Sequence, residues 1–301
     1  MNNINKNRLL VSFSGGETSA FMTYHLLYVW PHDYDEIAVV FANTGQENEA
    51  TLNFVHECDK QLNFGSVWVE AETQFNQRKA PNAKIVTFET ASRDGHPFED
   101  MIKKHGVPNQ AFPHCTRELK LAPIYSYLAS AGWKKGTYDI AIGIRADEID
   151  RMSVKAAKNR IIYPCIKYKI TKPVINSWWK TMPFRLDLKG YQGNCKWCWK
   201  KSDRKVMTLM LENPEFFDFP ARMEKNYGFI GPEFKLHADK LADDYRRVFF
   251  RKNRSTDNMR LMCEELPKEF KKAADDAVIY DPNWDVAGGC GESCEVFTDE
   301  D

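Results

Sequence analysis

Two glycines and several hydroxyl side chains join an apolar run to a helical pattern near the start of the chain. Residues 8–11 suit a buried strand, and apolar residues recur at helical spacing across residues 21–27. Glycine lets the backbone approach an anion closely, and the first N–H groups of a helix attract negative charge. An ordinary turn with a helix N-cap uses the same residue types, and the Gly-Lys-Ser/Thr triplet of a Walker-type P-loop does not follow. The sequence predicts a phosphate cradle made by Ser12, Ser14, Gly15, Gly16, Thr18 and Ser19.

Apolar runs alternate with helical patterns through the first half of the chain, which predicts strand–helix units and a parallel sheet. The expected strands are residues 9–13, 37–42, 67–70, 84–88 and 138–144, and the expected helices are residues 18–29, 48–62, 116–131 and 176–181. The fold class is therefore α/β, a twisted parallel sheet with helices on both faces. Ligands of such sheets bind outside the carboxyl ends of the strands. The cradle, the turn Asn43-Thr44-Gly45 and Arg145 all follow expected strands, so we expect them to share one site.

The Ser-Gly-Gly run resembles the Ser-Gly-Gly-x-Asp-Ser loop of the PP-loop ATP pyrophosphatase superfamily, with Thr18 in place of the aspartate. Within that superfamily, the first two-thirds of the chain resembles the phosphoadenylyl-sulfate (PAPS) reductase-like family. The other matching segments are Val39–Glu47, with Asn43 where the family has aspartate, Cys115–Pro123, Ile142–Glu148 with Arg151, and Gly193–Cys198. The resemblance implies an adenine nucleotide alpha hydrolase-like fold. It also implies that the nucleotide site includes Asn43, Thr44, Gly45, Arg145 and Arg151.

The chain has eight cysteines, and the resemblance gives four of them a shared role. Cys195 and Cys198 form a Cys-x-x-Cys pair at the position of such a pair in the iron–sulfur members of the family. Cys115 lies in a second matching segment, but His114 stands where adenylyl-sulfate reductases have another cysteine. Cys165 is then the expected fourth ligand, which is nearer the pattern of the DNA phosphorothioation sulfur-transfer proteins. Four thiolates suit a 4Fe–4S cluster, and zinc or the absence of a metal are the alternatives.

Cys290 and Cys294 lie in a glycine-rich, acidic C-terminal tail. PAPS reductases carry their nucleophilic cysteine in a Glu-Cys-Gly-(Leu/Ile)-His segment near the C-terminus, and Cys290-Gly291 matches only its centre. The glycines let the tail move over a cleft, and the two thiols can form a redox disulfide. Catalysis by these thiols competes with an incidental or metal-binding role.

Two reactions fit the resemblance. In the first, the enzyme binds ATP with Mg²⁺ and adenylates an acceptor, and sulfur held or delivered by the cluster displaces the AMP. In the second, it is a thioredoxin-dependent PAPS reductase, in which a tail thiolate attacks the sulfur of a sulfated adenosine nucleotide and sulfite is released. A nucleotide-sensing or assembly subunit without catalysis is a third alternative. Nucleic acid is one candidate acceptor for the first reaction.

Lysine plus arginine and aspartate plus glutamate both number 42, so no net charge attracts nucleic acid or an anionic membrane. Residues 155–205 are rich in lysine and arginine, which suits a cationic cleft for a polyanionic nucleotide. Apolar runs of membrane-spanning length and an apolar signal region are both missing from the sequence, which predicts a cytoplasmic protein. The composition becomes helical and charge-rich near residue 206. We therefore expect a nucleotide-binding α/β domain over residues 1–205 and a mostly helical region with the cysteine-containing tail over residues 206–301.

Overall fold

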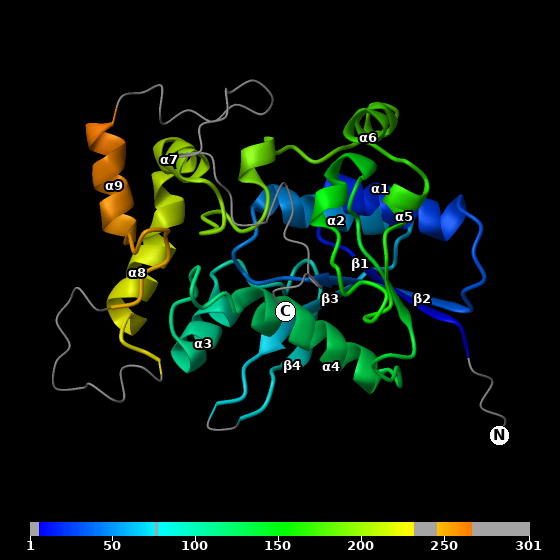
Figure 1. Ribbon diagram of the computed structural model, residues 1–301, viewed down its shortest axis with the longest axis horizontal. Coiled ribbons are helices and arrows are strands. Elements are labelled where there is room, and N and C mark those ends of the chain that lie inside the picture. Colours follow the sequence, from blue (N-terminus) through cyan, green and yellow to red (C-terminus); the bar gives the residue numbers. More distant parts are fainter. Residues whose placement is uncertain (1–5, 76–77, 232–245, 267–301) are drawn as a thin grey trace.

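The computed structural model describes residues 6–75, 78–231 and 246–266. At its centre is a six-stranded sheet with the strand order β4-β3-β2-β1-β5-β6 (Figure 1). The strands are β1 (Arg8–Ser12), β2 (Glu36–Ala42), β3 (Val67–Glu72), β4 (Asn82–Val86), β5 (Asp139–Ala141) and β6 (Ile161–Ile162). β4 is antiparallel to β3, and the other neighbouring pairs are parallel. The predicted α/β fold is confirmed, and the antiparallel β4 is the exception to the expected parallel sheet.

Helices cover both faces of this sheet (Figure 1). One face carries α1 (Glu17–Tyr28), α2 (Glu49–Leu62), α5 (Pro164–Lys167) and α6 (Lys172–Trp179), and the other carries α4 (Ala122–Ser130). Successive side chains of a strand point to opposite faces. Leu9 of β1 accordingly packs in the core under α1 and α2, whereas Leu10 packs in the core under α4. The two layers therefore have separate apolar cores.

A third core lies beside the sheet and joins the C-terminal helices to it. It packs α3 (His96–His105) with α7 (Asp203–Glu212), α8 (Asp218–Tyr227) and α9 (Thr256–Glu265), and Trp197 and Met223 are among its fully buried side chains. The expected helical C-terminal extension is thus present in the described residues. α7 continues across residue 205, and this core draws side chains from both sides of that residue, so the proposed domain division there stays a prediction.

The structure contains several elements that the sequence pattern did not predict, and most of them are short. The pattern missed β6 because two residues are too few to show an alternation, and it missed α3, which follows a left-handed Gly95. The remaining short helices are Arg117–Leu121 (π-helical) and the 3₁₀ segments Ala146–Arg151, Gly190–Gln192 and Pro214–Phe217. None of the helices in the described ranges is long and apolar enough to cross a membrane.

Glu224 of α8 forms hydrogen bonds to the segment that leads into α9. Its carboxylate accepts hydrogen bonds from the backbone N–H of Phe249 at 2.9 Å and from that of Thr256 at 2.8 Å. Burial raises the pKa of the Glu224 carboxyl to about 7, although both hydrogen bonds favour the charged form. The charge state of one side chain is therefore linked to the packing of the C-terminal helices.

This linkage predicts a pH-dependent stability. Because the folded pKa lies above the unfolded value of 4.5, the Glu224 carboxyl stabilises the folded chain fully below pH 4.5, and this stabilisation is lost as the pH rises towards 7. We expect the unfolding free energy of the native chain to fall by about 2 to 3 kcal/mol relative to Glu224→Gln across that window. Urea unfolding at a series of pH values measures the difference, with the exposed Asp257→Asn as control. Parallel pH profiles for the native chain and Glu224→Gln would contradict the assignment.

Candidate functional site

The predicted phosphate cradle forms the turn between β1 and α1, at the carboxyl edge of the sheet. Ser12 is the last residue of β1 and is buried, and Glu17 is the first residue of α1. Gly15 has a φ of 78°, and a Cβ at this position would lie 2.7 Å from Cγ2 of Thr51. Glycine alone tolerates both the left-handed backbone and this close approach. The turn therefore presents the unpaired N–H groups of the first turn of α1.

Hydroxyl groups bond within the turn, and Gly143 from the chain after β5 packs against the start of α1. The Ser14 and Ser19 hydroxyls are 2.9 Å apart, and the Ser19 hydroxyl donates to the carbonyl of Gly16 at 2.9 Å. Gly143, which follows β5, lies so close that a Cβ on it would be 3.0 Å from Cα of Ser19. The absence of a side chain at Gly143 lets the chain after β5 lie directly against the start of α1.

Arg145 extends from the chain after β5 towards the cradle. Its Nη1 lies 3.4 Å from the Thr18 hydroxyl and 3.4 Å from a carboxylate oxygen of Glu148, and its Nε lies 3.2 Å from Asp147. Arg151 pairs with the same Glu148 carboxylate. These contacts hold a nearly buried guanidinium beside the helix N-terminus, where it can form charge-assisted hydrogen bonds to a phosphate.

A cleft of about 620 Å³ opens beside these groups. The residues of the predicted nucleotide site that line it are Gly16, Thr18, Arg145 and Arg151. Lys172, Arg185 and Lys189 line it too, although no motif in the sequence indicates them individually. Against these five cations stand three lining carboxylates, Glu17, Glu148 and Asp187. The cleft therefore favours an anionic ligand.

The turn after β2 lies at the same edge of the sheet but does not line this cleft. The Asn43 side chain donates to the Glu70 carboxylate at 2.7 Å and accepts from the N–H of Gly45 at 3.1 Å. The backbone N–H of Thr44 donates to Glu47 at 2.8 Å, and so does its hydroxyl. The side chains of Asn43 and Thr44 thus hold the shape of the turn.

Three of the predicted thiol ligands, Cys115, Cys195 and Cys198, meet at a small pocket of about 20 Å³. We call it the thiol pocket. Thr44 also lines it, and its hydroxyl lies 3.7 Å from Sγ of Cys195. The thiol pocket and the turn after β2 are therefore neighbours.

Direct hydrogen bonds attach the Cys195–Cys198 loop to that turn. The Lys196 N–H donates to the carbonyl of Gln46 at 2.9 Å, and the indole N–H of Trp197 donates to the Gln46 side-chain oxygen at 2.5 Å. Glu47 and Cys195 form an isolated antiparallel bridge. Three consecutive residues, Cys195, Lys196 and Trp197, therefore connect the loop that carries two thiols to the turn.

Cys165 lies elsewhere. It is fully buried in the core on the α6 face of the sheet, together with Ile175 and Trp179, whereas Cys195 packs against the core under α7 to α9. Within residues 6–75, 78–231 and 246–266, no group of three or more His, Cys, Asp or Glu side chains is arranged to hold a metal ion. The described residues thus bring three of the four predicted thiols to one pocket and place Cys165 in a different core, and the four-thiolate cluster stays a prediction. Cys290 and Cys294 lie outside the described residues.

Lys120 is a buried cation at the thiol pocket and was not among the predicted site residues. Its Nζ lies 3.9 Å from the Glu47 carboxylate. Thr116 lines the same pocket four residues earlier. Residues four apart share one face of a helix, and that spacing within the Cys115–Pro123 segment was the available signal.

Comparison with models of protein families matches residues 8–161 to the phosphoadenosine phosphosulfate reductase domain. The matched region runs from β1 into β6 and contains the cradle and Arg145. A protein of Escherichia phage lambda, described as "Uncharacterized nin region protein ORF290", is 30% identical over 294 residues, which are 96% of this chain and 94% of that protein. The similarity to the phage protein therefore extends beyond the family domain into the C-terminal region.

Proposed function

Because the chain belongs to the phosphoadenosine phosphosulfate reductase family, we propose that it is an enzyme that binds an adenine nucleotide in the 620 Å³ cleft and uses it in sulfur transfer or reduction. One observation carries the proposal. Phosphate-binding groups from two separate connections of the sheet converge there, with Gly16 and Thr18 after β1 and Arg145 and Arg151 after β5. A helix N-terminus and guanidinium groups are groups that bind anions in proteins, and their presence at one cleft supports the proposal.

The phosphates would accept hydrogen bonds from the first N–H groups of α1 and from the Ser14 hydroxyl. Arg145 would bind the same phosphates and stabilise negative charge that develops on a leaving group. Mg²⁺ would balance the remaining phosphate charge, and hard cations of this kind prefer carboxylate and phosphate oxygens. Glu17 and Glu148 pair with arginines, so Asp187, which forms no ion pair in the described part of the chain, is the carboxylate that would hold the ion.

In the reaction we favour, an acceptor oxygen attacks the α-phosphorus of ATP, the bond to the β-phosphate oxygen breaks and pyrophosphate leaves. A sulfur nucleophile then displaces AMP from the adenylated acceptor. The position of the thiol pocket supports this sequence, because Thr44 joins the pocket to the turn at the nucleotide edge of the sheet. Lys120 would favour the anionic form of a thiol or of a bound sulfur species there. The predicted iron–sulfur cluster stays a prediction, and none of these steps requires it.

Sulfonucleotide reduction is the second candidate, and the family match favours it. A thiolate would attack the sulfur of the bound sulfated nucleotide, the nucleotide phosphate would leave, and a reductant of the thioredoxin type would release sulfite and restore the thiol. Cys290 and Cys294 are the proposed nucleophiles of this route. The same cleft would hold the nucleotide in both reactions.

Product analysis separates the two routes. Release of pyrophosphate and AMP from ATP with Mg²⁺ in the presence of a sulfur donor supports adenylation, whereas release of sulfite from a sulfated adenosine nucleotide with a dithiol supports reduction. Absence of nucleotide binding by calorimetry would contradict both.

The cradle itself can be tested by a hydroxyl deletion. Ser14→Ala removes a donor to a charged phosphate, so we expect nucleotide affinity to fall by roughly 10- to 150-fold. Ser130→Ala makes the same change at the end of α4 and should leave affinity unchanged. Isothermal titration calorimetry measures both variants, and equal affinity of Ser14→Ala and the native chain would reject the cradle.

A further inference from the structure

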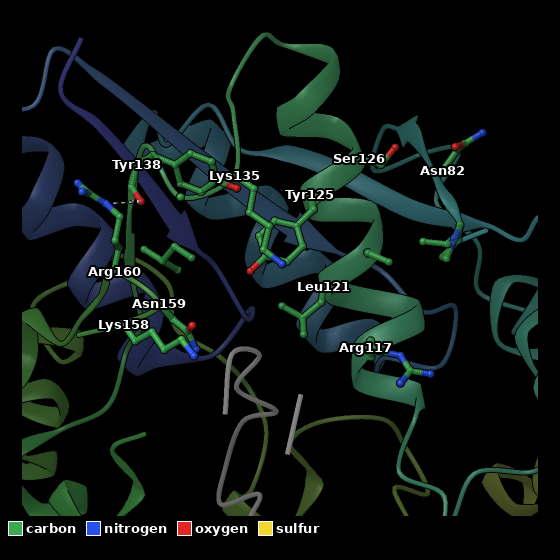
Figure 2. A pocket seen from close by; sticks show the side chains of 15 residues that line it. Asn82, Arg117, Leu121, Tyr125, Ser126, Lys135, Tyr138, Lys158, Asn159 and Arg160 are labelled. Carbon is green, nitrogen blue, oxygen red and sulfur yellow. Dashed lines mark hydrogen bonds between the residues drawn. The ribbon is translucent and has the colours of Figure 1, made fainter. Parts of the chain in front are cut away.

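A second pocket, of about 680 Å³, lies on the α4 face of the sheet (Figure 2). We call it the α4 pocket. α4 forms one wall, and the residues that precede β4, β5 and β6 form the others. The nucleotide cleft has a different set of lining residues, so the two cavities are distinct.

Four cations line the α4 pocket: Arg117, Lys135, Lys158 and Arg160. Among the described residues that line it, none is an aspartate or glutamate. Lys158 forms no ion pair in the described part of the chain. Arg117 pairs with Glu118 at 2.8 Å and Arg160 pairs with Asp139 at 2.7 Å, but their side chains remain 58% and 43% exposed. The chain as a whole is neutral, so this concentration of positive charge is local and would attract an anionic ligand to this position.

The pocket also presents an aromatic ring above an apolar floor. Leu121 and Ile140 contribute apolar surface, and the half-buried ring of Tyr125 lies between the cationic walls (Figure 2). Nζ of Lys135 is 4.3 Å from the centre of that ring. The ammonium lies over one face of the ring, so a planar group would stack on the other face or displace the ammonium.

The cations are too far apart to serve a single phosphate. Arg117 precedes α4 and Lys135 follows it, and a helix of nine residues is about 13 Å long at 1.5 Å per residue. Lys158 and Arg160 lie on the opposite wall (Figure 2). The ligand that fits this spacing carries several phosphates along its length and a planar ring between them.

We propose that the α4 pocket binds single-stranded nucleic acid. A strand carries one phosphate for each nucleotide, and its unpaired bases offer faces that stack on aromatic side chains. A duplex would satisfy the cations but would keep its bases away from Tyr125. DNA and RNA strands share this chemistry, and the experiment below distinguishes them.

The position of the pocket connects it to the thiols. In the segment Arg117–Leu121, Arg117 and Leu121 line the α4 pocket, whereas Lys120 lines the thiol pocket. The two pockets therefore share this segment and lie on different faces of it, so a strand bound in the α4 pocket would be one helical segment away from the thiol pocket. This placement makes nucleic acid the acceptor class for the sulfur transfer proposed above and rests on that proposal, but the binding itself does not.

Fluorescence anisotropy with labelled ten-nucleotide thymidine DNA and uridine RNA tests the binding on the full chain. We expect Lys158→Ala to reduce the slope of log affinity against log salt by about 0.7, the value for one phosphate contact on a single strand. The matched control Lys60→Ala, on α2 at the opposite face, should keep the native slope. Tyr125→Ala should weaken binding roughly 5- to 150-fold, and Tyr125→Phe should restore most of it.

Each outcome decides the proposal. Binding of one strand type with these losses supports it and identifies DNA or RNA as the source of the ligand. No binding by the native chain, or equal losses in Lys60→Ala and Lys158→Ala, overturns it. Loss of strand binding in Ser14→Ala would place the strand in the nucleotide cleft and also overturn it. Because strand binding and nucleotide binding are measured separately, either proposal can fail without the other.

Discussion

Alanine in place of Trp197 is expected to lower the free energy of unfolding by about 3 to 5 kcal/mol, the usual cost of truncating a fully buried aromatic side chain. The indole is 0% exposed. Its ring centre lies 5.2 Å from that of Phe98, 5.6 Å from that of Phe219 and 4.7 Å from that of Phe249. The cavity would therefore open between α3, α8 and the Cys195–Cys198 loop. Urea unfolding measures the loss.

The variant should also expose the thiols, because Trp197 donates one of the two hydrogen bonds that attach the loop to Gln46. We expect Cys195 to react faster with a thiol reagent in Trp197→Ala than in the native chain. Trp197→Phe keeps most of the apolar volume and removes only the indole donor, so its stability loss should be smaller, about 1 to 3 kcal/mol. Equal stability losses in the two variants, with unchanged thiol reactivity, would show that the indole does not hold the loop.

Glutamine in place of Arg145 is expected to weaken adenine nucleotide binding by roughly 10- to 150-fold, the effect of losing a charge-assisted hydrogen bond to phosphate. Arg145→Lys keeps the charge but loses the planar fork, so its affinity should be intermediate. Calorimetry measures the affinity, and thermal unfolding checks that the variants fold, since Asp147 and Glu148 lose a partner. The exposed Arg222→Gln on α8 is the matched control.

Unchanged nucleotide affinity in Arg145→Gln would remove the chain after β5 from the nucleotide site. An equal loss in Arg222→Gln would instead mean that affinity follows the overall charge of the chain. Only a loss confined to Arg145 supports the proposed contact.

The sheet could be predicted because its pattern is local. Residues 8–12 and 36–42 form apolar strands at the expected places, and the turn that follows β1 carries Gly15, the glycine that its left-handed backbone requires. β6 could not be predicted, since its two residues pair only because β5 lies beside them. The antiparallel direction of β4 could not be predicted either, because strand direction depends on the course of the chain between strands and not on composition.

The sequence predicted which segments of the chain form the candidate site, but not the contacts that individual side chains make there. Arg145 lies beside the cradle, as its position just after an expected strand suggested. Asn43 was expected in the nucleotide site, but its amide holds the turn together, which the sequence does not reveal. Cys165 shows the same limit, because a thiol among apolar residues can face a ligand or a core, and the packing of α5 against α6 decides which.

The hydrogen bonds between Gln46 and the Cys195–Cys198 loop have an energetic consequence. The turn after β2 lies at the same edge of the sheet as the cleft, so a nucleotide that reaches from the cleft to this turn would favour one arrangement of the turn and the matching arrangement of the loop. Such coupling is reciprocal, so oxidation or loading of the thiols would change nucleotide affinity by the same factor by which the nucleotide changes the equilibrium at the thiols. Nucleotide binding in the cleft and the oxidation or loading of the thiols would then be thermodynamically linked.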